Sequence, residues 1–195
     1  MPFHQIAIPE GSSFKHIPSD RTFILERSSS LNTLKLTLYH QEAHGLKTHA
    51  GFLDAISQPS GSCGRNYFEM SYTKVDIKYR KTGLATVLMF IIAREVQANG
   101  GIYLYINNPL KKYYGFYCQF GFYPAPESVK EQYTEILEDM RFMRRAKGLS
   151  VDEHIEIPFG DRITTMRGDY VLWRGAINPV LELLTKKLEG LYTFG

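Results

Sequence analysis

Four residues in the stretch "VDIKYRKTGLATVL" have the types and the spacing that anion binding needs. Arg80, Lys81, Thr82 and Gly83 stand directly before an apolar run that begins at Leu84. A glycine-containing turn that leads into a helix presents free backbone N–H groups and the positive end of the helix dipole to one point. The sequence therefore predicts an anion site here, with ordinary solvated turn residues as the alternative interpretation. Neither common phosphate motif, G-x-x-x-x-G-K-[ST] or G-x-G-x-x-G, occurs in the chain.

Composition places the chain among globular proteins. Its 195 residues, 44% hydrophobic and 22% charged, are enough for one domain with a real core. A net charge of +3 does not by itself indicate nucleic acid, so no nucleic-acid partner is expected. Two cysteines, Cys63 and Cys118, form neither a disulfide framework nor a metal-ligand spacing. The N-terminus lacks the features of a signal peptide, and the longest apolar run is about half a membrane span. We therefore expect a cytoplasmic protein with no membrane partner.

The elements that must position the anion site alternate between strands and helices. Apolar and polar residues alternate in "TLKLTLYH", which is typical of a half-buried strand. "YFEMSYTKV" reads as the returning strand of a hairpin that begins with "HAGFLDAISQ". The run over 84–98 predicts a buried helix, which "NGG" at 99–101 ends. "IYLYIN" predicts a buried strand, and a short aromatic helix follows it.

The C-terminal third predicts more of both elements. A charged helix with one apolar face is predicted over 127–147, "DYVLWRG" is a predicted strand, and Asn178-Pro179 is expected to cap a final helix. The order of elements predicts a mixed α+β or α/β arrangement around one sheet. We expect a single domain over 1–195, with a core at 33–124 and a C-terminal elaboration at 125–195.

Two motifs in this order resemble the GNAT superfamily, the Gcn5-related N-acetyltransferases. "RKTGLA" fits the family's R/Q-x-x-G-x-G/A signature, and "FYCQFGF" fits the later element Y-x-x-x-G-F. One helix and one strand separate them, as in the family. The resemblance implies a central twisted mixed sheet with flanking helices, in which acetyl-CoA lies between two parallel strands.

The resemblance also implies which residues hold the cofactor. Backbone amides of residues 81–86 would bind the pyrophosphate of acetyl-CoA. Val75 and Ile77 would offer backbone hydrogen bonds to the pantetheine arm, and Asn107 or Asn108 resembles the family's asparagine at the strand end. The implied cofactor-binding set is Val75, Ile77, Arg80, Lys81, Thr82, Gly83, Leu84, Ala85, Thr86 and Asn108, and no metal is expected.

Acetyl transfer to an amine needs a base for the ammonium and an acid for the leaving thiolate. By position in the resemblance, Tyr117 would be the acid and Glu69 the base. A core aromatic is the alternative for Tyr117, and a solvent-facing strand residue is the alternative for Glu69. The cluster of His40, Glu42, His44 and His49 is not H-E-x-x-H, and a polar hairpin loop explains it.

The sequence thus predicts an acetyl-CoA-dependent N-acetyltransferase that acts on a primary amine of a small molecule or a protein. A non-catalytic acyl-CoA-binding or regulatory module is one alternative. An acetyltransferase acting on charged tRNA, with Arg144 and Arg145 meeting phosphates, is another. The expected partners are acetyl-CoA and the amine acceptor, and formation of a homodimer is left open.

Overall fold

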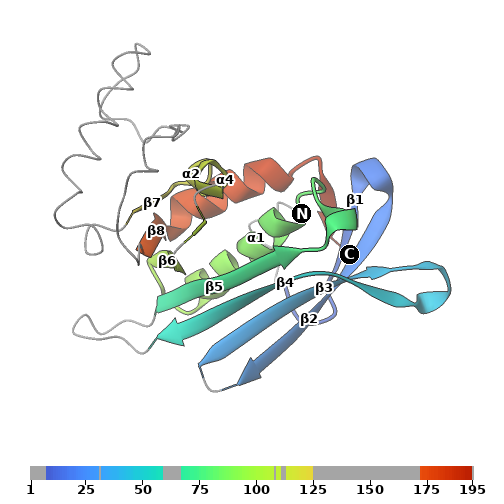
Figure 1. Cartoon of the computed structure of the whole chain (residues 1–195), viewed down its shortest axis with the longest axis horizontal. Helices are drawn as coiled ribbons and strands as arrows, with labels where there is room; N and C mark the ends of the chain where they lie inside the picture. The colour runs from blue at the N-terminus through green and yellow to red at the C-terminus, as the bar shows by residue number, and fades with distance from the viewer. Residues whose placement is uncertain are drawn as a thin grey trace, which may run out of the picture.

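The computed structural model describes residues 8–30, 32–58, 67–107, 109–110, 113–124 and 172–194. These segments form a nine-stranded sheet in the order β7-β8-β6-β5-β4-β3-β2-β1-β9 (Figure 1). Within the described segments, β5 and β6 are parallel and every other neighbouring pair is antiparallel. The predicted mixed α+β fold is confirmed.

Five strands that are consecutive in the sequence form one half of the sheet. The structure confirms the strands predicted around "TLKLTLYH" and "YFEMSYTKV", and Leu36 and Leu38 are fully buried. The serine run 28–30 belongs to a strand, because it pairs with residues 33–35. Two short 3-10 helices, η2 (Ile17–Ser19) and η3 (Ala43–Gly45), connect strands here. The five strands are β1 (Ser13–His16), β2 (Arg21–Ser30), β3 (Thr33–Gln41), β4 (Lys47–Gln58) and β5 (Tyr67–Val75).

The helix predicted over 84–98 is confirmed as α1 (Leu84–Ala98). It connects β5 to the parallel strand β6 (Tyr103–Asn107) and packs on β4, β5 and β6. Most of its side chains are buried because the sheet covers one side and a second helix covers another. The helix ends as predicted: Gly100 has a φ of 71°, and the Gly101 N–H donates to the Val96 carbonyl at 2.8 Å.

The second helix is α4 (Ile177–Leu188), which packs along α1. Its buried face consists of Ile177, Val180, Leu181, Leu184 and Leu188. The prediction that Asn178 caps this helix is wrong, since Ala176 is the N-cap residue and Asn178 and Pro179 lie in the first turn. Pro179 is tolerated there because the N–H groups of a first turn have no partner within the helix.

The remaining elements join the far parts of the chain to this sheet. They are α2 (Tyr114–Cys118), β7 (Phe122–Pro124), β8 (Leu172–Ala176) and β9 (Tyr192–Phe194). Strand β8 lies between β6 and β7, and β9 pairs with β1 at the opposite edge. The helix predicted over 127–147, including Arg144 and Arg145, lies outside the described residues.

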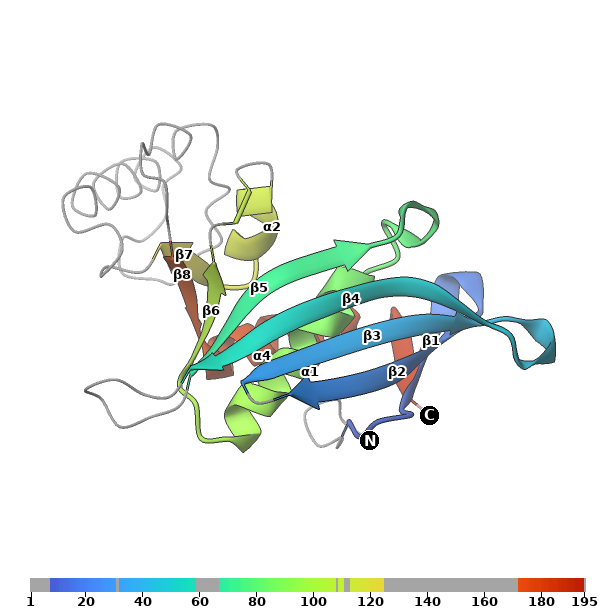
Figure 2. The same ribbon diagram turned by 60° about the horizontal axis from the view of Figure 1, so that its bottom comes forward.

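Helices α1 and α4 lie on the same face of strands β2–β5 (Figure 2). In both views the opposite face of these strands carries no α-helix of the described residues. Among the described helices, none is long and apolar enough to cross a membrane.

Candidate functional site

Strand β5 loses its parallel partner halfway along its length. Residues 68–70 of β5 pair with 104–106 of β6, but β5 continues to Val75 without β6 beside it. A bulge in the β4–β5 pairing, between Asp54 and Ala55, makes Ser71 the extra residue where this separation begins. Residues 71–75 therefore form an edge of β5 that faces away from β4, and we call it the open edge.

The open edge presents backbone hydrogen-bonding groups at alternate residues. The Asp76 N–H donates to the Ala50 carbonyl at 2.9 Å, which fixes the phase of the β4–β5 ladder. In an antiparallel ladder, alternate residues direct their N–H and C=O groups to the same neighbour. Thr73 and Val75 therefore direct their N–H and C=O groups away from β4, toward the side where β6 no longer pairs with β5. The Val75 carbonyl accepts a long hydrogen bond from Arg80 Nε at 3.4 Å.

The turn between β5 and α1 follows the open edge directly. A 3-10 helix, η4 (Ile77–Tyr79), places the predicted residue Ile77 outside the strand, with 80% of its surface exposed. Lys81 and Gly83 then adopt the left-handed conformation, with φ of 65° and 86°. This reversal, which Gly83 permits without strain, points the chain into α1.

Six consecutive N–H groups in this turn have no hydrogen-bond partner within the described part of the chain. They belong to residues 81–86, and the first helical bond of α1 is donated by the Val87 N–H to the Gly83 carbonyl at 3.1 Å. No side chain caps the helix. Unpaired N–H groups at a helix N-terminus bind anions well. We call residues 81–86 the anion turn.

The predicted cations lie at the rim of the anion turn. Arg80 and Lys81 are exposed and form no salt bridge with any described residue. Leu84 and Thr86 are buried, so within the anion turn these two can serve a ligand through their backbone only. The hydroxyl of Thr82 is already used, since it donates to the Tyr79 carbonyl at 2.6 Å.

Glu69 lies on the last part of β5 that β6 still pairs, opposite Tyr105. Its side chain lies on the face away from α1, because its neighbours Phe68 and Met70 pack into the α1 side of the core. Glu69 is only 7% exposed, yet within the described residues it forms no salt bridge and no side-chain hydrogen bond. A solvent-facing strand residue, the alternative interpretation, would be more exposed.

Two further polar groups, one at the end of β6 and one on α2, have no hydrogen-bond partner among the described residues. Asn107 is the last residue of β6, and its Oδ1 atom is buried without a hydrogen bond. The hydroxyl of Tyr117, on α2, forms no hydrogen bond with a described residue. The Tyr117 ring packs on Phe116 and Phe122, and burial raises its pKa. The predicted Asn108 lies outside the described residues.

Two histidines of the cluster seen in the sequence, His40 and His49, contact different partners. His49 Nδ1 lies 2.7 Å from Asp76 Oδ2, while His40 Nδ1 lies 3.2 Å from the Tyr79 hydroxyl. Burial, and then the charge of Arg21, lowers the pKa of His40. In the described part of the chain, no group of three or more histidine, cysteine or acidic side chains could hold a metal ion. Cys118 is buried, which raises the pKa of its thiol.

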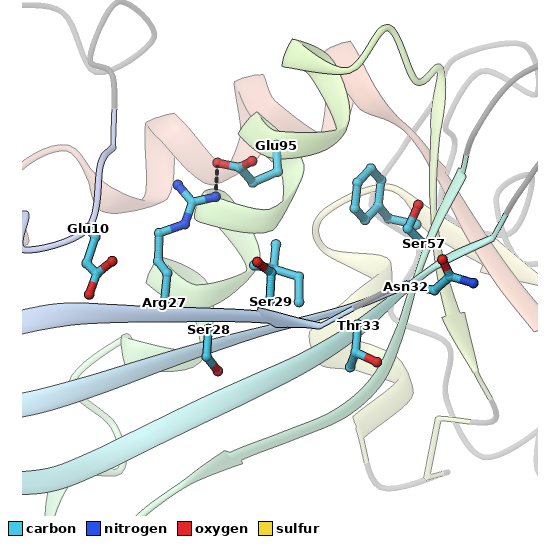
Figure 3. A pocket seen from close by; sticks show the side chains of 10 residues that line it. Glu10, Arg27, Ser28, Ser29, Asn32, Thr33, Ser57 and Glu95 are labelled. Carbon is cyan, nitrogen blue, oxygen red and sulfur yellow. Dashed lines mark ion pairs between the residues drawn. The ribbon is translucent and has the colours of Figure 1, made fainter.

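A hollow in the described part of the chain lies elsewhere. It has a volume of about 480 Å³ and lies between the β2–β3 hairpin and the C-terminal half of α1 (Figure 3). Arg27 and Glu95 point toward each other there and form a salt bridge of 2.7 Å. Glu95 is about 18 Å along α1 from Gly83, so this hollow is not part of the anion turn.

Sequence reasoning missed two contributors to the site. Thr73 lies on the open edge, but only the bulge and the pairing register reveal which β5 residues face outward. Tyr192, on β9, donates a hydrogen bond of 2.8 Å from its hydroxyl to the Thr82 carbonyl within the anion turn. No local sequence pattern links two residues so far apart.

Several solved structures resemble the chain. One is a Desulfovibrio desulfuricans protein assigned to the GNAT family of acetyltransferases (15% identity, TM-score 0.43, 75% of this chain and 70% of that chain). Another is Arabidopsis thaliana Naa50 in complex with the bisubstrate analogue CoA-Ac-MVNAL (12% identity, TM-score 0.44, 73% of this chain and 72% of that chain). A third is Tetrahymena GCN5 (14% identity, TM-score 0.41, 77% of this chain and 71% of that chain). No protein-family model and no curated protein matches the chain.

The nine-stranded mixed sheet with its helices has the mixed α+β arrangement that the sequence predicts. At such identities and TM-scores the likeness carries no argument about activity or substrate.

Proposed function

We propose that the protein is an N-acetyltransferase that transfers the acetyl group of acetyl-CoA to a primary amine of a small molecule or a protein. One observation carries the proposal: the anion turn, with six unpaired N–H groups, directly follows the open edge of β5. Coenzyme A has the matching chemistry, because its diphosphate is joined to a pantetheine arm that contains two amide groups.

The anion turn and the open edge would bind different parts of the cofactor. The diphosphate would accept hydrogen bonds from the N–H groups of residues 81–86, and Arg80 and Lys81 would add positive charge at the rim. The pantetheine amides would pair with Thr73 and Val75 of the open edge, as an added strand would. The unpaired Oδ1 of Asn107 could accept an amide N–H from the same arm.

The proposed reaction runs through addition and elimination at the thioester carbonyl. The ammonium form of the acceptor first loses a proton, which Glu69 accepts directly or through water. The neutral nitrogen then forms a bond to the acetyl carbon, the carbon–sulfur bond breaks, and the second proton that the nitrogen loses passes to the CoA thiolate. The products are the acetamide and CoA. Glu69 suits the role of base because its carboxylate is unpaired among the described residues and next to the point where β5 and β6 separate.

Tyr117 would stabilise the leaving sulfur. Burial raises the pKa of its phenol, so the hydroxyl stays protonated at neutral pH and can donate a hydrogen bond. A thiol has a pKa of about 8.5 and a phenol about 10, so complete transfer of the proton to the thiolate is uphill. We therefore assign Tyr117 the role of a donor that shares its proton with the sulfur as negative charge develops.

Two measurements test the proposal. Isothermal titration calorimetry with CoA measures binding at the anion turn, and a thiol-release assay with acetyl-CoA and a panel of primary amines measures transfer. Amine-dependent thiol release supports the proposal. Binding of CoA without turnover on any amine would favour the non-catalytic acyl-CoA-binding alternative. Absence of CoA binding would refute both.

The alternative with a charged-tRNA acceptor is tested separately. It relied on Arg144 and Arg145, which lie outside the described residues. Acceptor binding through phosphates would weaken steeply as salt concentration rises, whereas binding of a small amine without phosphates would change much less. Measuring the acceptor KM at two salt concentrations therefore distinguishes the acceptors.

A further inference from the structure

Tyr192 connects the last strand of the sheet to the anion turn. Its side chain is 3% exposed, and its hydroxyl donates to the Thr82 carbonyl at 2.8 Å. A Cβ atom placed on Gly83 would lie 3.6 Å from the Tyr192 ring, so the ring also packs against the backbone of the turn. Both contacts are to the same peptide unit.

The hydrogen bond fixes the direction of one N–H group in the anion turn. The Thr82 carbonyl and the Gly83 N–H belong to a single planar peptide, which is trans. In a trans peptide these two groups point in opposite directions. Because Tyr192 is buried and holds the carbonyl toward the core, the Gly83 N–H must point away from the core. Glycine is the residue that permits most rotation of this peptide if the bond is lost.

Strand β9 holds the Tyr192 hydroxyl in a rigid setting. Tyr192 pairs with His16 of β1, and the Phe194 ring lies 4.8 Å from the Phe14 ring and 6.3 Å from the Phe90 ring of α1, centre to centre. The strand is therefore packed against the helix that follows the anion turn. Burial raises the pKa of Tyr192 to about 12, so the hydroxyl remains a donor over the physiological range.

We propose that Tyr192 is a positioning residue for cofactor binding. Its hydroxyl orients the Thr82–Gly83 peptide so that the Gly83 N–H is already aimed at the diphosphate of CoA before the cofactor arrives. The inference rests on the proposed function, since it concerns the same anion turn. It has a specific consequence: Tyr192 matters for ligands that carry the diphosphate and not for those that carry the pantetheine arm alone.

The variant Tyr192→Phe removes the hydroxyl and keeps the ring. We expect it to weaken CoA binding about tenfold in calorimetry, the usual size of one well-placed hydrogen bond. The KM for S-acetylpantetheine, which has no diphosphate, should be unchanged, and so should kcat at saturating acetyl-CoA. A residue with a merely structural role would affect both acetyl donors alike.

Tyr79→Phe is the matched control. Tyr79 lies in η4 just before the anion turn and is 2% exposed, but its hydroxyl is paired with His40 Nδ1 and not with a carbonyl of the turn. This variant also loses one buried hydroxyl, so any general loss of stability should be similar. Its affinity for CoA should equal that of the unmodified protein.

Hydrogen exchange on the unmodified protein gives a second readout, which holds even if Tyr192→Phe does not fold. Binding of CoA should protect the amides of residues 81–86 and, through Tyr192, those of β9, whereas S-acetylpantetheine should protect neither. Protection of the turn without any change in β9 would overturn the inference. So would an unchanged affinity of folded Tyr192→Phe for CoA. Failure of the unmodified protein to bind CoA would instead refute the proposed function.

Discussion

The substitution Gly83→Asp should abolish most of the affinity for CoA. Gly83 has a φ of 86°, and its N–H is one of the six unpaired N–H groups of the anion turn. The Cβ atom of an aspartate would lie on the side of Tyr192 (3.6 Å) and Leu191 (3.9 Å), so its negative charge would stand beside the diphosphate and not in its place. For a carboxylate about 5 Å from a diphosphate of charge about −2, at an effective dielectric constant of about 40, the repulsion is about 3 kcal/mol. That corresponds to about a 150-fold increase in Kd.

Gly83→Asn is the control that isolates the charge. Asparagine has nearly the shape of aspartate, and both tolerate the left-handed conformation better than other residues with side chains. A Cβ atom at this position meets the Tyr192 ring at 3.6 Å, which is ordinary contact, and the atoms beyond Cβ have nearly the same shape in both variants, so any packing cost should be shared. Both should lose about 1 kcal/mol of stability from the backbone conformation.

Calorimetric titration of CoA into both variants measures the effect directly. The difference between the two Kd values should be about two orders of magnitude at low salt and should shrink as salt is raised, because exposed charges are screened. If Gly83→Asp and Gly83→Asn bind CoA within twofold of each other, the diphosphate does not lie at this turn, and the assignment of residues 81–86 is refuted.

Three further variants probe the chemistry and the packing. Tyr117→Phe should lower kcat by about 10- to 100-fold while leaving the Kd for CoA nearly unchanged. A loss of stability alone, seen in thermal unfolding, would indicate that Tyr117 is a core aromatic without a role in catalysis. Glu69→Gln should depress the rate most near pH 7 and least near pH 10, where the acceptor amine loses its proton unaided, and a pH–rate profile parallel to that of the unmodified enzyme would place the base elsewhere. Gly175→Ala should destabilise the fold by about 1–3 kcal/mol in urea denaturation, since its Cβ would lie 2.6 Å from Val180 Cγ2 and 3.0 Å from Phe122 Cδ1; unchanged stability would show that β8 and α4 can move apart.

Local patterns were enough to predict the parts of the fold that are defined by periodicity and breakers. Helix α1 begins and ends where the apolar run and "NGG" indicate, and the alternation in β3 gives its buried face. The anion turn was also visible, because a glycine before an apolar run is a local signal. Strand β1 and strand β9 were not predicted, since each is short and is held by the partner across the sheet.

The parts of the site that depend on register could not be read from the sequence. Ile77 was expected to offer backbone hydrogen bonds to the pantetheine arm, but the chain turns into η4 at Asp76, and Thr73 is the alternate residue beside Val75 on the open edge. The partnerless state of Glu69 and of Asn107 Oδ1 also depends on three-dimensional neighbours. The sequence alone indicates which residue types suit acetyl transfer, whereas the strand pairing determines which of these residues face the open edge.

The pairing of β9 with β1 has a consequence for how the protein folds. Phe14 lies opposite Phe194, so closing this edge of the sheet requires segments from nearly opposite ends of the sequence to meet. Contacts of such long range form late, because the entropy of closing the loop must be lost before they contribute. During synthesis, α1 and its preceding turn leave the ribosome long before Tyr192 does. A nascent chain would therefore contain the anion turn without the hydroxyl that orients it, and tight cofactor binding would arise only after the last strand docks.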